Sequence, residues 1–122
     1  MEHDVLKIIN AELSDLGLHY EYDEFTGELV YPYLVGEFSE SGYAYEDNAT
    51  NGEMILTCFH RGSRADMIRV KELIKDRFRD YRCVVDGGAI HIAYTHELFL
   101  RSGEADLKKM EIYLEIRYWE GE

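Results

Sequence analysis

The sequence predicts an α+β domain in which an antiparallel β-sheet carries two amphipathic helices on one face. Its 122 residues, 46% of them hydrophobic with a single proline, suit one globular core. Two segments repeat apolar residues every three or four positions, and several others alternate apolar and polar residues. Short turns between consecutive strands require antiparallel pairing. We therefore expect a single domain over residues 1–122, in the order α-β-β-α-β-β, that ends in a long C-terminal hairpin.

The first element is a helix, because its apolar residues recur at spacings of three and four. This stripe consists of Val5, Leu6, Ile9, Leu13 and Leu16. Asp4 suits the N-cap, and Gly17 suits a left-handed residue just past the C-terminus. The acidic, aromatic segment 19–28 that follows predicts a short strand or an ordered loop.

Residues 29–38 are β-branched and aromatic, which predicts a strand. Pro32 cannot donate a ladder hydrogen bond, so it belongs at the start of a strand, at an edge or at a bulge. Gly36 indicates a bulge or a close approach to the backbone.

A polar connection is predicted over residues 39–52, with the turn-forming pair Asn51 and Gly52 at its end. It is longer than most hairpin loops, and long loops often carry function. Residues 53–60 then form a strand with Met54, Leu56 and Cys58 on one face.

The second helix begins at a capping box, in which Asp66 follows Ser63 by three residues. Its apolar stripe consists of Met67, Val70, Leu73, Ile74 and Phe78. Residues 83–85 predict a short strand that ends in a glycine turn.

The C-terminal hairpin is predicted from two alternating segments. In the first, period two places Ile90, Ile92, Tyr94, Leu98 and Leu100 on one face. Phe99 falls on the opposite parity, and His96 shares that of the apolar set. In the second segment, Met110 to Tyr118 alternates regularly and predicts one buried face.

The net charge of −12 is unevenly distributed along the chain. Residues 1–60 hold 13 acidic residues and one basic residue, whereas residues 61–82 hold eight basic and four acidic residues. This balance disfavours binding to nucleic acid or to anionic lipid, which needs a clustered positive face. Either the charges form an ordinary solvated surface, or the basic segment of one copy meets the acidic surface of the next.

No catalytic, metal-binding or cofactor-binding motif is recognisable, so we expect neither an enzyme nor a cofactor. Cys58 and His60 lie two residues apart without a zinc-ligand spacing, and Glu115 to Arg117 only approaches a nuclease motif. The N-terminus lacks the pattern of a secretion signal, and the apolar runs are too short to span a bilayer, so we expect no membrane contact. The two cysteines are expected to be reduced thiols, although their number alone permits a disulfide.

The sequence from Tyr31 to Glu37 resembles a strand found in small proteins of long-tailed bacteriophages. These belong to the tail terminator, tail completion and head-to-tail joining group. The resemblance continues through the strand Leu56–Arg61 with Ser63 and Arg64, the helix Met67–Arg79 and the hairpin Ile90–Trp119.

The resemblance implies a structural protein of the virion tail or neck, assembled in the bacterial host cytoplasm. Such a protein forms a ring, commonly a hexamer, that caps the tail tube and joins it to the head connector while DNA passes through without being held. Its partners would be further copies of itself, the tail-tube protein and the head connector or completion protein. The expected interface residues are Tyr43, Tyr45, Glu46, Asp47, Arg61, Arg64, Arg69, Lys75 and Arg79.

Two alternatives remain open. The first is a small ligand-binding or peptide-binding module, whose sheet face would expose Tyr113 and Trp119. The second is an enzyme that uses carboxylates in an unrecognised arrangement.

Overall fold

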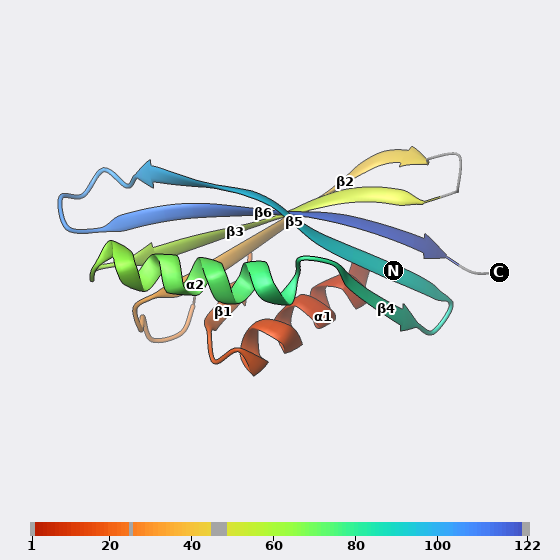
Figure 1. The fold of residues 1–122 in the computed structure, drawn as a ribbon, viewed down its shortest axis with the longest axis horizontal. Helices are drawn as coiled ribbons and strands as arrows, with labels where there is room; N and C mark the ends of the chain where they lie inside the picture. Colours follow the sequence, from red (N-terminus) through yellow and green to blue (C-terminus); the bar gives the residue numbers. More distant parts are fainter. Residues whose placement is uncertain (1, 25, 45–48, 121–122) are drawn as a thin grey trace.

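The computed structural model describes residues 2–24, 26–44 and 49–120, with residues 42–44 described by their backbone alone (Figure 1). Its helices are α1 (Glu2–Asp15) and α2 (Arg64–Arg77). The strands are β1 (His19–Tyr22), β2 (Tyr33–Ala44), β3 (Thr50–His60), β4 (Tyr81–Val85), β5 (Gly88–Arg101) and β6 (Lys108–Glu120). They form one six-stranded sheet in the order β1-β2-β3-β6-β5-β4.

Both helices cover the same face of this sheet, as the sequence predicts. Val5, Ile9 and Leu13 of α1 are buried in one apolar cluster with Met67 and Ile74 of α2. The same cluster takes in the inward-facing residues of β6 over the predicted range: Met110, Ile112, Leu114, Ile116 and Tyr118. The α+β class and the period-two reading of the last strand are confirmed. The opposite face of the sheet has no helix over it in the described part of the chain (Figure 1).

The sheet is mixed, so the prediction of a purely antiparallel sheet is wrong. β1 pairs with β2 in parallel, with His19 opposite Tyr33 and Tyr22 opposite Gly36. The predicted order α-β-β-α-β-β leaves out the two short edge strands, β1 and β4, although a short strand is predicted over residues 83–85 and a short strand or an ordered loop within residues 19–28. Parallel pairing is possible here because residues 23–32 connect the two strands and leave room for the chain to return.

The β2–β3 hairpin is longer than predicted. β2 continues to Ala44 and β3 begins at Thr50, so residues that predict a polar connection lie in paired strands. Gly52, predicted to lie in a turn, is instead buried opposite Glu40 in the ladder. A Cβ atom at Gly52 would lie 2.7 Å from the Phe38 ring, so glycine serves packing at this position.

β5 contains a bulge that reverses the predicted faces of its second half. The register shifts between Tyr94 and His96, where the Thr95 hydroxyl donates a 2.9 Å hydrogen bond to the carbonyl oxygen of Tyr113. One extra residue changes the parity, so Phe99 packs against the core and His96 stacks on Tyr113 at 4.3 Å between ring centroids.

Most of the predicted local signals are confirmed. Gly17 is left-handed with φ of 77°, and the Leu18 amide donates to the carbonyl oxygen of Leu13 at 3.0 Å, which closes α1. Pro32 lies just before β2, and the Tyr20 hydroxyl lies 2.5 Å from the position of a Cβ at Gly36. The Ser63 side chain caps α2 by accepting from the Asp66 amide.

Two helix predictions are wrong. Asp4 lies inside the first turn of α1 instead of at its N-cap, because the helix begins at Glu2. Leu73 is exposed on the outer side of α2, because the narrow stripe of Met67, Val70 and Ile74 already fills the contact with the sheet.

Candidate interaction surfaces

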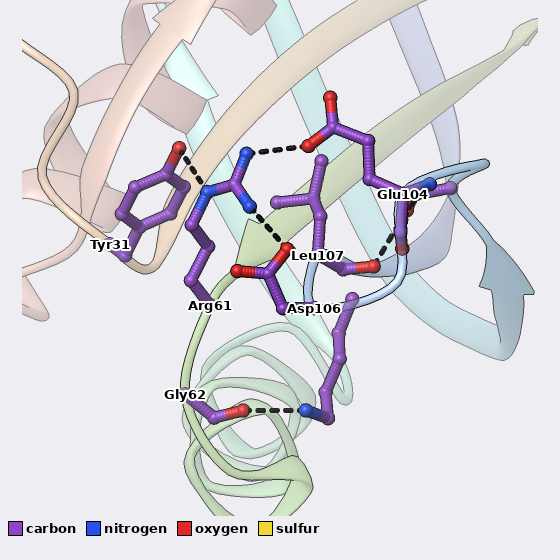
Figure 2. A network of polar contacts seen from close by, with 8 residues as sticks. Tyr31, Arg61, Gly62, Glu104, Asp106 and Leu107 are labelled. Carbon is purple, nitrogen blue, oxygen red and sulfur yellow. Dashed lines mark hydrogen bonds and ion pairs between the residues drawn. The ribbon is translucent and has the colours of Figure 1, made fainter.

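Arg61 joins three separate segments at one end of the sheet (Figure 2). It follows β3, and its guanidinium donates to Glu104 at 2.6 Å and to Asp106 at 2.7 Å, both in the turn between β5 and β6. Its Nε also donates to the Tyr31 hydroxyl at 3.2 Å. These hydrogen bonds raise the pKa of Arg61 and keep both carboxylates beside a positive charge.

Two further contacts hold the same turn, residues 102–107. The Ser102 hydroxyl donates to the carbonyl oxygen of Leu107 at 2.6 Å. The Lys108 ammonium donates to the carbonyl oxygen of Gly62 at 2.8 Å (Figure 2). The turn is therefore tied to the segment that leads from β3 into α2, and contacts within the chain fix its shape.

The basic residues predicted for an interface differ in how strongly they contact other residues of the same chain. The Arg61 guanidinium already contacts two carboxylates of the β5–β6 turn. Arg69 lies 3.9 Å from Asp66, and Arg79 lies 3.2 Å from Asp76; their side chains are 75% and 70% exposed. Pairs this exposed contribute little to stability, so a partner can exchange them at small cost.

Arg64 and Lys75 each lie over an aromatic ring, and Lys75 also interacts with the charge of Glu97. The Arg64 guanidinium carbon is 3.9 Å from the centroid of Phe99, and the Lys75 ammonium is 5.8 Å from that of Tyr94. Both charges are therefore held in place by cation–π contacts.

The predicted acidic interface lies only partly within the described residues. Tyr43 belongs to the backbone of β2, whereas Tyr45, Glu46 and Asp47 lie outside the described residues. The chain that holds them connects Ala44 to Thr50, which pair at the tip of the β2–β3 hairpin. β3 leads from this tip to His60, which pairs with Lys108 at the opposite end of the sheet.

The uncovered face of the sheet carries half-buried aromatic and aliphatic side chains. Tyr33 stacks on Phe59 at 5.2 Å between centroids, and Arg117 lies over Trp119 at 5.4 Å. A hollow of about 460 Å³ on this face is lined by Trp119, Arg117 and Val84, among others. Both tyrosine and tryptophan suit contact with another molecule.

His60 is a buried polar residue next to the core, and it contacts Asp66. The His60 Nε2 lies 2.9 Å from Asp66 Oδ2, and this hydrogen bond lowers the pKa of Asp66. The sequence predicts Asp66 as a reciprocal cap for Ser63, but its carboxylate binds His60. Burial raises the pKa of the Cys58 thiol to about 12, so this thiol is not activated for nucleophilic chemistry.

The described residues contain no group of three or more His, Cys, Asp or Glu placed to hold a metal ion. Both cysteines are free thiols, one buried and one partly buried. Within the ranges that the structure describes, neither helix has the length and apolar character needed to cross a bilayer.

The link between Arg61 and the β5–β6 turn is the feature that the sequence reasoning missed. Arg61 is 43 residues from Glu104 and 45 from Asp106, and no local motif joins them. The turn that carries these two acids leads into β6, and β6 lies next to β3 in the sheet, so the link becomes visible once the strand order is known.

Comparison with known proteins leaves the family of this chain unassigned: no model of a protein family matches it, and neither does any curated protein.

Proposed function

We propose that this chain is a structural subunit of a long-tailed bacteriophage or prophage. In this proposal, copies assemble into a ring, expected to be a hexamer, at the end of the tail tube. The ring joins the tube to the head connector and has no catalytic role.

One observation carries the proposal: the tip of the β2–β3 hairpin, in the acid-rich part of the sequence, and Arg61, where the basic segment begins, lie at opposite ends of β3. A closed ring needs two unlike surfaces on each subunit, because every copy contacts the next one head-to-tail. Arg69 on α2 and Arg79, just after the end of α2, are exposed and weakly paired, so they are available to the neighbouring copy. In this proposal, the acidic residues predicted for the interface contact the neighbour or line the channel, where negative charge would keep DNA sliding.

The test is complementation in a lysogen or phage from which the gene has been deleted. Without the protein, we expect filled heads and tail tubes that fail to join, as seen by negative-stain electron microscopy. The wild-type gene should restore tailed particles. Normal tailed particles in the deletion strain would disprove the proposed function.

A matched pair of variants tests the contact through α2. Arg69→Glu and Lys7→Glu each reverse one exposed positive charge on a helix. We expect Arg69→Glu to restore few tailed particles and Lys7→Glu to restore them fully. Full restoration by both variants would show that Arg69 on α2 does not contact the neighbouring copy, without contradicting the proposal that the chain is a structural subunit.

A ligand-binding module is the second candidate, favoured by the hollow beside Trp119 on the uncovered face. Trp119 is the only tryptophan of the chain, so a ligand in this hollow would change the tryptophan fluorescence. A saturable change with a small molecule would favour this candidate over a structural subunit.

A further inference from the structure

A second cavity lies at the end of the sheet where Arg61 holds the β5–β6 turn. It has a volume of about 590 Å³ and lies between the start of α2, the end of β5 and the start of β6. Its size is within the range of pockets that take small ligands or a few side chains. Its lining combines apolar and basic residues, among them Phe99, Leu107, Arg64, Arg101 and Lys108.

The cations of this cavity differ from most of the others in the chain. Six basic residues elsewhere in the described part of the chain contact carboxylates of the same chain: Arg61, Arg69, Lys71, Arg77, Arg79 and Arg82. Within the described residues, Arg64 and Arg101 make no ion pair, and Lys108 donates to a backbone carbonyl. The chain has a net charge of −12, so basic residues without a carboxylate partner that line one cavity indicate a site for a negatively charged ligand.

The strand register adds to this concentration of positive charge. Arg101 and Lys108 are direct cross-strand partners at the end of the hairpin. Like charges in this position repel each other and destabilise the pair. An anion bound between them would relieve the repulsion.

The turn contacts explain why the nearby acids do not neutralise these cations. Glu104 lines the cavity and Asp106 lies in the same turn, but both carboxylates contact Arg61. Arg64 is also held in place, because its guanidinium lies 3.9 Å from the Phe99 centroid. The turn beside the cavity is therefore shaped, and Arg64 is positioned, before any ligand arrives.

From this arrangement we infer that the cavity binds an acidic peptide segment of a partner protein. Arginine presents a planar fork of donors that matches a carboxylate. The apolar wall formed by Phe99 and Leu107 suits a large apolar side chain next to the acid. A long nucleic acid would be repelled by the acidic remainder of the surface, whereas a short peptide brings few charges. The inference does not depend on whether the chain forms a ring.

The test uses the full chain and two fluorescein-labelled synthetic peptides in a polarisation titration. The acidic probe is Gly-Asp-Phe-Glu-Asp-Gly, and the neutral control is Gly-Asn-Phe-Gln-Asn-Gly. We expect the acidic peptide to bind at least tenfold more tightly than the neutral one. Its affinity should fall severalfold when NaCl is raised from 50 to 500 mM, because salt screens exposed charges. Equal binding of both peptides, or none at 1 mM protein, would overturn the inference.

Two double variants locate the binding. Arg64→Ala with Arg101→Ala removes two cations from the cavity, and Lys7→Ala with Arg82→Ala removes two exposed cations elsewhere. We expect about tenfold weaker binding in the first and less than a twofold change in the second. An unchanged far-UV circular dichroism spectrum shows that each variant is folded. Similar losses in both variants would mean a general charge effect and would reject the site.

Two further outcomes would identify a different occupant. If 10 mM inorganic phosphate at constant ionic strength displaces the acidic peptide, the cavity is a phosphate site and the peptide assignment is wrong. If the wild-type chain self-associates in sedimentation and the cavity variant does not, the occupant is a second copy. In the expected result, phosphate does not compete and both variants sediment like the wild type.

Discussion

The unequal covering of the two sheet faces predicts different effects for the same substitution at two neighbouring positions. Ile112 in β6 is fully buried under the helices, whereas Ile55 in β3 is half-buried on the uncovered face. They lie in adjacent strands, where Ile55 pairs with Tyr113. Ile112→Ala and Ile55→Ala therefore remove the same atoms from similar backbone positions with different surroundings.

The expected losses follow from what each side chain contacts. Truncating a buried isoleucine removes its transfer free energy and leaves a cavity, which costs about 2–5 kcal/mol. Because Ile112 is 0% exposed in the centre of the core, we expect a loss of about 3–4 kcal/mol in the free energy of unfolding. Ile55 leaves no closed cavity, so about 1 kcal/mol is expected from its partial burial. The lost strand propensity is common to both and cancels in the comparison.

Urea denaturation followed by circular dichroism measures the difference. With m near 2 kcal/mol/M, the transition midpoint should fall by roughly 1.5–2 M for Ile112→Ala and by about 0.5 M for Ile55→Ala. Equal losses would refute the one-sided packing, because they would require the face of Ile55 to be covered as tightly as that of Ile112. A loss for Ile55→Ala that depends on protein concentration would instead point to self-association through this face.

Two further predictions concern the polar contacts. Arg61→Gln removes the positive charge between Glu104 and Asp106, so amide hydrogen exchange in the β5–β6 turn should accelerate while the core strands stay protected; unchanged exchange would show that the turn does not need this contact. The hydrogen bond with His60 lowers the pKa of Asp66 in the folded state, so the ionised carboxylate of Asp66 stabilises the fold. This stabilisation is fully present above the ordinary carboxylate pKa of about 4 and is lost as the pH falls through the lowered pKa. Asp66→Asn should therefore lose less stability than the wild type between pH 5 and pH 2 in thermal melts, and identical pH profiles would contradict this role.

The signals read correctly from the sequence are those that depend on near neighbours along the chain. Gly17 and Ser63 end and begin helices because their partners lie within five residues. The alternation from Met110 to Tyr118 likewise states which face is buried, because one strand has a fixed period of two.

Tertiary structure decided the features whose partners are distant in the chain. The Thr95 bulge turns Phe99 into the core because packing against β6 selects the register, although the sequence alternation alone places Phe99 outside. Gly52 lies in a strand and not in a turn, and the Phe38 ring fills the space that a side chain at this position would need. The charges of Arg61 and Glu104 meet only because β3 and the β5–β6 hairpin are neighbours in the sheet. The sequence by itself determined the α+β class and the faces of its regular elements. Which strands became neighbours, and hence which charges are neutralised and which remain available to a partner, was settled by long-range packing, because no local pattern encodes it.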